Sequence, residues 1–341
     1  LPQSFPGLSV SSASDASVFT VMGTGLDDRL ALRQTLRGLN SRMQLSLFAD
    51  NPTDRVIWGR DHWLFLADAI EKPLVNRFQP DTLHGSLSEL SRIGRAERQF
   101  YIAIAPNKEA IYPDYLGQAD QAAVKVGRER LDAFGKLEDQ SPIPGYIDLV
   151  AALESERARV APQPVYYPQD THWNGLGAAV LVREIVEDQA PGLWSDDAIV
   201  RTPDRPRIYD LSRMAALMEF TDQANYVAER PGVSVTRTDR EADIVQFDAK
   251  GTGPALLPPI VVLHDSFGEA LKDVMPPWFK TTTFIHHRAV GTEEARQLIS
   301  GADTVVYELV QRHVYARGVG SRPRPWGQDL ERLLSVPRAS R

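Results

Sequence analysis

The chain contains no cysteine, and this absence excludes several kinds of chemistry. Without thiols the protein forms no disulfide, has no cysteine nucleophile and cannot bind zinc through cysteine. A cysteine-free chain is compatible with both the cytoplasm and the bacterial periplasm, so the absence does not decide the compartment.

Long hydrophobic runs are also missing. The most apolar run, 255–263, is interrupted by Pro258 and Pro259. It is much shorter than the roughly 20 residues that a membrane-spanning helix needs. The chain begins at Leu1 rather than at a methionine. We therefore expect that a signal peptide or an anchor has been removed from a longer precursor.

Basic residues are not in excess, since 38 Lys and Arg face 45 Asp and Glu and the formal net charge is −7. The basic residues are scattered along the chain, whereas a nucleic-acid-binding protein normally has a basic face. The composition therefore argues against a nucleic-acid partner. A length of 341 residues with 43% hydrophobic residues allows a large buried core, in one elaborated domain or two ordinary ones.

The signatures of several enzyme classes are absent as well. The chain has no Gly-rich phosphate loop, no His-Glu-x-x-His-like helix and no Gly-x-Ser-x-Gly turn. These absences argue against phosphate-loop enzymes, zinc hydrolases with that helix and ordinary α/β-hydrolases.

Apolar strands alternate with amphipathic helices over most of the chain. Fully apolar strands in such an alternation predict an α/β fold with a buried, mostly parallel sheet that helices cover on both faces. A hairpin at 56–66 and a helix at 83–93 precede the first of these strands. The strands are expected at 100–105, 146–150, 259–263, 282–285 and 304–309, and the helices between them at 178–186, 269–274 and 292–299.

The composition suggests two regions. Residues 1–50 are predicted as an N-terminal leader, rich in Ser, Pro and Gly up to residue 25, followed by an amphipathic helix at 27–48. Residues 51–341 are predicted as one domain, which contains the alternating strands and helices. An insertion at about 205–250 interrupts its alternation with a helix at 211–218 and exposed strands at 234–238 and 244–247. This insertion could form one wall of a substrate cleft.

Ser266 is the candidate nucleophile. It follows the apolar strand at 259–263 and precedes a predicted helix, so it lies at a strand-to-helix turn. That position exposes a side chain at the carboxyl end of a sheet and at the positive end of a helix dipole. A serine hydroxyl still needs a histidine to accept its proton and a carboxylate to orient the histidine. Asp265 is expected to serve the turn, with its side chain away from the nucleophile.

Asp170 and His172 can supply the base and its carboxylate. In an extended segment residues i and i+2 point the same way, about 6.5 Å apart, so the carboxylate can reach the imidazole. Asn174 is expected to cap the helix that follows. The alternative is that Asp170 caps this helix and His172 packs against Trp173.

Acyl transfer also needs hydrogen-bond donors for the oxyanion. The backbone N–H of Ser266 and the side chain of Asn107, at the end of a neighbouring strand, are the candidates. Asn107 could equally be a turn residue after Pro106. A metal hydrolase is the chemical alternative, although tandem histidines in a strand point to opposite faces. Its candidate ligands are His264, Asp265, His286, His287, Asp170 and His172.

Several blocks resemble known enzymes. The His-Asp-Ser-Phe-Gly run at 264–268 resembles the Gly-Asp-Ser-Phe block of SGNH hydrolases. The Asp-Thr-His-Trp-Asn run at 170–174 resembles the Asp-x-His signature of the AlgJ and AlgX group of alginate O-acetyltransferases. In that group the Asp-x-His block also precedes the serine. Similar segments at 59–65, 105–113 and 209–211 extend the resemblance over about residues 55–310.

The resemblance implies an SGNH-hydrolase-like, flavodoxin-like fold and a periplasmic enzyme that acetylates an exported polysaccharide such as alginate. Ser266 would be the acetylated nucleophile, His172 the base and Asp170 its orienting carboxylate, without a cofactor or metal. A membrane-bound O-acyltransferase would deliver the acetyl group, within a polysaccharide export complex. An N-terminal segment absent from this chain would anchor the protein to the inner membrane.

Further residues are expected around the site. His264 replaces the usual glycine, and either crowds the turn or adds a donor near the serine. The chain ends soon after the catalytic fold, so we expect no appended carbohydrate-binding module and a polymer held by the cleft alone. Trp63, Tyr115, Glu308 and Gln311 could line this cleft, although core packing is the ordinary role of such aromatic residues. The predicted oxyanion- or substrate-binding residues are Asn107, Lys108, Tyr112, Trp173 and Arg312.

Two other functions fit the same sequence. The first is a carbohydrate acetylesterase of the SGNH type, in which water rather than a sugar hydroxyl takes the acetyl group. The second is a non-catalytic glycan-binding subunit of an export complex, in which Ser266 has no chemical role.

Overall fold

The computed structural model describes residues 54–75, 79–202, 208–217, 223–240, 243–252, 255–316 and 327–337. The predicted leader and the predicted helix at 27–48 lie outside these residues, so both stay predictions. Within the described ranges, no helix combines the length and the hydrophobicity that crossing a bilayer requires.

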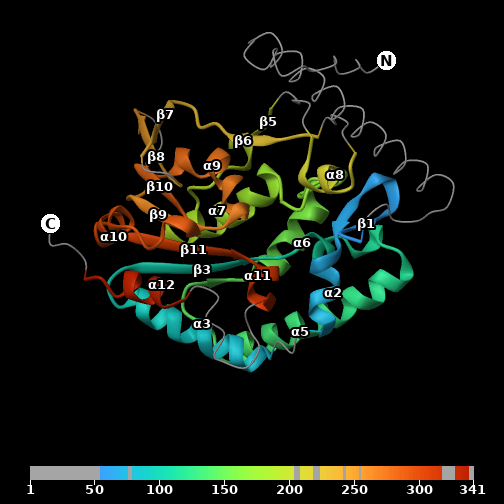
Figure 1. Ribbon diagram of the computed structural model, residues 1–341. Coiled ribbons are helices and arrows are strands. Elements are labelled where there is room, and N and C mark those ends of the chain that lie inside the picture. Colours follow the sequence, from blue (N-terminus) through green and yellow to red (C-terminus); the bar gives the residue numbers. More distant parts are fainter. Residues whose placement is uncertain are drawn as a thin grey trace, which may run out of the picture.

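A seven-stranded sheet forms the centre of the molecule (Figure 1). Its first five strands are parallel, and the last two are antiparallel to their neighbours. This arrangement confirms the predicted α/β fold with a mostly parallel sheet. In spatial order the strands are β4 (Tyr146–Ile147), β3 (Gln99–Ala105), β11 (Thr304–Val310), β9 (Ile260–His264), β10 (Thr281–His286), β8 (Ile244–Gly251) and β7 (Val233–Asp239).

Helices cover both faces of the sheet, as the apolar central strands require. Along β9, Val262 contributes to one hydrophobic core and Val261 and Leu263 to the other. The first core contains α6 (Leu149–Val160), α7 (Gly175–Gln189) and α9 (Leu271–Val274). The second contains α3 (Pro80–Arg95), α10 (Glu293–Ser300) and α12 (Gly327–Leu334), while α5 (Gln118–Gln140) packs into both.

The predicted hairpin is present as β1 (Val56–Trp58) and β2 (Leu64–Leu66), joined through a 3₁₀ turn. It leads into α2 (Ala67–Val75). The backbone N–H of Leu64 donates to the carbonyl of Pro168 at 2.9 Å. The hairpin therefore packs against the loop that carries Asp170.

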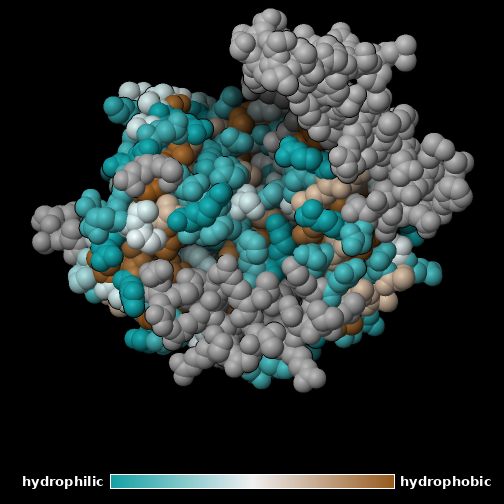
Figure 2. Space-filling model, in the orientation of Figure 1, coloured by the Kyte–Doolittle hydropathy of each residue, from teal (hydrophilic) through white to brown (hydrophobic). Residues whose placement is uncertain are grey.

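The insertion has the predicted helix, as α8 (Asp210–Met214), and the two predicted strands, as β7 and β8. Because β8 pairs with β10, these strands extend the main sheet. A separate pair, β5 (Ile199–Arg201) and β6 (Tyr226–Ala228), lies beside α9 (Figure 1). On the face in Figure 2 the described residues are mainly hydrophilic, with small separate hydrophobic areas.

Three details of the predicted elements were wrong. The strand at 146–150 ends at Ile147, because the carboxylate of Asp148 accepts the N–H of Val150 at 3.0 Å and starts α6. The long helix α5 was not predicted, since its hydrophobic positions are sparse. His286 and His287 do not point to opposite faces: the strand ends at His286, and the two rings pack with centroids 4.2 Å apart.

Candidate active site

Ser266 lies at the carboxyl end of β9, in a turn that Asp265 holds. One carboxylate oxygen of Asp265 accepts the N–H of Phe267 at 2.9 Å, and the other accepts the N–H of Val310, at the end of β11, at 2.9 Å. His313 also contacts this second oxygen at 2.8 Å. The Asp265 side chain is thus committed to the turn, as the sequence predicted, and the half-buried Ser266 is left accessible.

His264, in place of the usual glycine, packs closely against Gly268 in this turn. Its Nδ1 donates to the carbonyl of Asp265 at 2.6 Å, and burial lowers the pKa of the ring to about 4. A Cβ on Gly268 would lie 2.4 Å from the Cβ of His264, so a side chain at 268 does not fit without movement. A histidine here therefore requires a glycine two residues after the serine.

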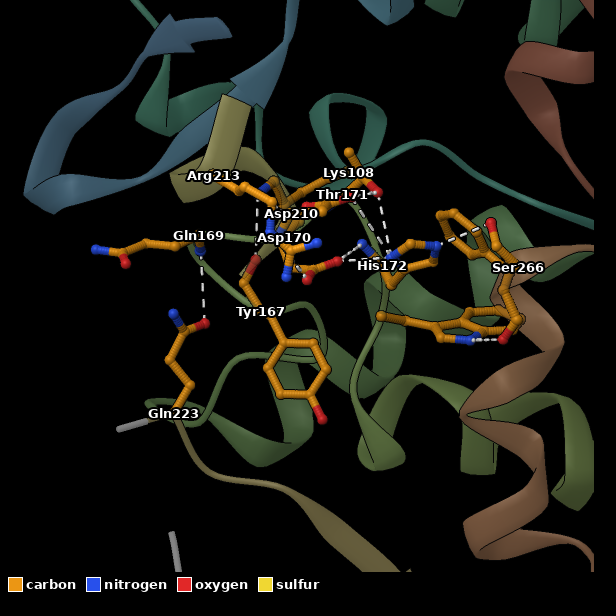
Figure 3. A network of polar contacts seen from close by, with 12 residues as sticks. Lys108, Tyr167, Gln169, Asp170, Thr171, His172, Asp210, Arg213, Gln223 and Ser266 are labelled. Atoms are coloured by element: carbon orange, nitrogen blue, oxygen red, sulfur yellow. Dashed lines mark hydrogen bonds and ion pairs between the residues drawn. The ribbon is translucent and has the colours of Figure 1, made fainter. Parts of the chain in front are cut away.

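The three residues predicted as nucleophile, base and carboxylate lie in one hydrogen-bonded row (Figure 3). The Nε2 of His172 is 2.9 Å from the Oγ of Ser266, and its Nδ1 is 2.6 Å from an oxygen of Asp170. With Nδ1 protonated towards the carboxylate, Nε2 is free to accept the serine proton. The arrangement can therefore generate a reactive alkoxide.

Asp170 is held as a carboxylate although it is buried. Burial by itself favours the neutral acid, but the hydrogen bond and charge of His172, with the backbone N–H groups of Asp210 and His172, lower the pKa of Asp170 well below its usual range. The N–H of Asp210 reaches the outer oxygen at 3.2 Å. An ionised Asp170 fixes the tautomer of His172 and can stabilise its positive charge during reaction.

Residues after His172 join this loop to the nucleophile turn. Asn174 caps α7 as predicted, accepting the N–H groups of Leu176 and Gly177 at 2.9 and 3.2 Å. Asp170 does not cap that helix. The indole N–H of Trp173 donates to the carbonyl of Phe267 at 2.8 Å.

The prediction that Trp173 binds substrate is corrected by its burial, since a side chain with 0% exposure cannot stack on a sugar. Tyr112 is also a core residue, 3% exposed, and its hydroxyl accepts the N–H of Val165 at 2.9 Å. Trp63 packs against Tyr112 with ring centroids 4.5 Å apart. These aromatic residues follow the ordinary rule that large rings fill cores.

Lys108 was predicted near the substrate, but it is only 3% exposed and lies beneath the loop that carries Asp170. It begins the short helix α4 (Lys108–Ile111) after β3. Its ammonium donates to the carbonyls of Tyr167, Pro168 and Asp170 at 3.1, 2.9 and 2.7 Å. Burial lowers the pKa of Lys108 to about 7, against the charges of Asp170, Asp210 and Glu109. Lys108 therefore positions the loop rather than a ligand.

We expect Lys108→Met to destabilise the protein by about 1–3 kcal/mol, because buried carbonyls lose hydrogen bonds, and to lower activity by displacing Asp170. The folded protein releases the Lys108 proton more readily than the unfolded chain does. The free energy of unfolding of wild type should therefore rise relative to that of the variant as pH increases from about 7 towards the ordinary lysine pKa of about 10.4. Urea denaturation at pH 6 and pH 9 measures this. A pH-independent difference, or an equal effect of Lys125→Met on the exposed face of α5, contradicts it.

Asn107 follows β3, immediately before α4, and is almost completely buried. Its backbone N–H donates to the side chain of Gln311 at 2.8 Å, while its side-chain amide lies near the Glu109 carboxyl and partly offsets the rise that burial causes in the pKa of Glu109. Arg312 is half-buried in α11 (Gln311–Ala316), with its guanidinium carbon 5.1 Å from the centroid of the Phe267 ring. Glu308 is fully buried and lines a cavity together with Asp265 and His313.

The predicted metal ligands are not gathered as a set. Within the described part of the chain, the carboxylate and imidazole atoms close enough to share an ion belong to Asp170, His172 and Asp210. These atoms already bond to one another or to Thr171, which donates its N–H and hydroxyl to Asp210 at 2.8 and 2.5 Å. The carboxylate of Asp265 is bonded to Phe267, Val310 and His313. The hydrogen bonding therefore favours a proton-transfer site over a metal site.

The sequence did not single out Thr171 and Asp210 as part of the site. Asp210 appeared only within the similar segment 209–211, and no spacing rule links it to His172. Its carboxylate oxygen nevertheless lies 3.8 Å from the Nδ1 of His172 (Figure 3).

Comparison with known proteins places residues 56–257 within the family of the SGNH hydrolase-like domain of the acetyltransferase AlgX. A protein named as the probable alginate O-acetylase AlgJ of Pseudomonas fluorescens is 25% identical over 201 residues, which are 55% of this chain and 48% of that protein. This chain thus matches about half the length of that relative.

Two solved structures share the fold. The structure of Pseudomonas aeruginosa AlgX aligns with a TM-score of 0.50 and 12% identity, over 82% of this chain and 66% of that one. The structure of Bacillus cereus PatB1 aligns with a TM-score of 0.50 and 15% identity, over 79% of this chain and 98% of that one.

Proposed function

The chain belongs to the SGNH hydrolase-like family of the acetyltransferase AlgX, and we propose on this premise that it is an O-acetyltransferase acting on an exported bacterial polysaccharide. The observation that carries the proposal is the unbroken row of hydrogen bonds from Asp170 through His172 to Ser266. The name of the Pseudomonas fluorescens relative supports alginate or a similar polymer as the acceptor.

The proposed reaction has two halves. In the first, His172 takes the proton of Ser266 while the serine oxygen attacks the carbonyl carbon of an acetyl ester. The ester bond breaks, and the departing alcohol takes the proton from His172, leaving acetyl-Ser266. In the second half, His172 takes the proton of a sugar hydroxyl, the sugar oxygen attacks the acetyl carbon, and Ser266 leaves with the proton.

The negative charge that develops on the acetyl oxygen needs fixed donors. We assign this role to the backbone N–H of Ser266, at the start of its 3₁₀ turn, and to the side chain of Asn107. The position of Asn107 between the carboxyl end of β3 and the start of α4 supports the assignment. Arg312, beside Phe267, is the proposed contact for the substrate.

The setting of the reaction is also proposed. The acceptor would be met in the periplasm, where the family resemblance places such enzymes, with an N-terminal anchor in the inner membrane. A membrane-bound O-acyltransferase would supply the acetyl group, and the protein would work beside a polysaccharide export complex.

Transfer and hydrolysis differ only in the nucleophile that reaches acetyl-Ser266, and one experiment separates them. The purified protein is incubated with an isotope-labelled acetyl ester, with and without oligosaccharides of alginate, and the sugars are analysed by mass spectrometry. We expect labelled acetyl groups on the sugar and slower release of free acetate when sugar is present. Free acetate alone, with every oligosaccharide tested, would identify an esterase.

A further inference from the structure

The insertion brings a second carboxylate to the triad. Asp210 is the first residue of α8, and its carboxylate lies 3.8 Å from the Nδ1 of His172. This is the same imidazole nitrogen that Asp170 contacts. The backbone N–H of Asp210 donates to the outer oxygen of Asp170 at 3.2 Å. Asp210 therefore contacts the carboxylate through its backbone and faces the imidazole through its side chain (Figure 3).

Thr171 links Asp210 to the backbone between the other two residues. The hydroxyl oxygen of Thr171 lies 3.2 Å from the Nδ1 of His172. The N–H and hydroxyl of Thr171 both donate to the Asp210 carboxylate, at 2.8 and 2.5 Å. The single side chain of Asp210 thus restrains the short segment from which Asp170 and His172 project.

α8 is itself fixed against the triad loop. The hydroxyl of Ser212 donates to the side chain of Gln169 at 3.0 Å, and the rings of Tyr167 and Tyr209 pack with centroids 5.3 Å apart. The Asp210 side chain is 28% exposed. The contacts of α8 with the loop and the hydrogen bonds from Thr171 therefore hold the Asp210 carboxylate in one position.

The ionised form of Asp210 is disfavoured while His172 is neutral. Burial and the neighbouring charge of Asp170 raise the pKa of Asp210, while the hydrogen bonds from Thr171 and the charge of His172 oppose the rise. Two carboxylates beside one neutral imidazole repel each other, but an imidazolium attracts both. The carboxylates of Asp170 and Asp210 therefore interact more favourably with the imidazolium form of His172, which arises while Ser266 attacks, than with the neutral imidazole.

We propose that Asp210 is a positioning residue that orients the Asp170–His172 pair and stabilises the imidazolium formed during acetyl transfer. This inference rests on the proposed function, since it requires His172 to act as a base. The insertion would then contribute a residue that acts on His172 during the reaction, in addition to any part in forming the substrate cleft.

The test uses Asp210→Asn, which keeps the size of the side chain and the backbone N–H but removes the charge. The matched control is Asp197→Asn, which removes a charge from an exposed first-turn aspartate elsewhere. Rates of acetyl-ester cleavage are measured from pH 5 to pH 9 for both variants and wild type. The other charges around the imidazole, on Asp170, Lys108 and Arg312, are unchanged in both.

We expect Asp210→Asn to lower kcat about tenfold with little change in KM, since its role is in the transition state. The acid limb of the profile should move to lower pH by about one unit, because a carboxylate within about 4–6 Å favours the protonated imidazole. Asp197→Asn should leave both unchanged. Thr171→Val should lower the rate in wild type but add little in Asp210→Asn, because the two residues act as one unit.

Two outcomes would overturn the proposal. One is an Asp210→Asn variant with wild-type rates. The other is a slower variant whose acid limb has not moved, which would reduce Asp210 to a structural hydrogen-bond acceptor. Ser266→Ala, assayed alongside, separates this failure from that of the proposed function. If Ser266→Ala remains active, the proposed reaction itself is wrong, whatever Asp210 does.

Discussion

Replacing Ser266 with alanine should lower acetyl-ester cleavage and acetyl transfer by about 10⁴–10⁶-fold, because no other group in the row can carry the acetyl intermediate. Intact-protein mass spectrometry after a short exposure to donor should show one added acetyl group in wild type and none in the variant. The fold should survive, since the hydrogen bonds that hold the turn come from Asp265 rather than from the serine hydroxyl.

The control for this prediction is Ser234→Ala on the exposed strand β7, where the hydroxyl donates to the carbonyl of Lys250. It should keep full activity and acetylation. If Ser266→Ala also kept both, Ser266 would have no chemical role. A glycan-binding subunit would then be the better description of the protein.

Asp170→Asn should cost about 10⁴-fold in rate while leaving the site almost unchanged in shape. An amide that donates towards Nδ1 favours the imidazole tautomer with its proton on Nε2, and that tautomer cannot accept the proton of Ser266. Acetylation of Ser266 should therefore become the slow step, visible as the loss of the initial burst in acetyl-ester cleavage. Asp148→Asn, at the start of α6, should be harmless because an asparagine caps a helix equally well.

Asp170→Asn should also change how the free energy of unfolding depends on pH. Because the folded protein holds the pKa of Asp170 below its usual range, the ionised group contributes stability above the unfolded pKa of about 3.9, and this contribution is lost as pH falls below it. Wild-type stability should thus fall more steeply than that of Asp170→Asn on acidification below about pH 4. Parallel curves, or a normal burst in the variant, would contradict the role given to Asp170.

Much of the site followed from local rules. The apolar run before Ser266 predicts a buried strand, and β9 is that strand, with Ser266 just beyond its carboxyl end. The spacing of Asp170 and His172 predicts that both point the same way. Asn174 caps α7 because its short side chain reaches the free N–H groups of the first turn.

The residues that were wrongly predicted to bind substrate show what local sequence patterns do not contain. Lys108, Tyr112 and Trp173 are chemically suited to binding a sugar, and only packing shows that they are buried. A lysine is expected at the surface unless acceptors surround it, and here the acceptors are three carbonyls from a loop far along the chain. No pattern within a short window contains that information.

The sequence by itself determined the class of fold, the turn that presents Ser266 and the pairing of Asp170 with His172. Each of these depends on residues close together in the chain, through hydrophobic periodicity, turn chemistry and side-chain direction. Only the tertiary structure decided that His172 reaches Ser266, that Lys108 lies beneath the loop and that Asp210 faces the imidazole. Those contacts join segments separated by dozens of residues, and the packing of the whole sheet sets their distances.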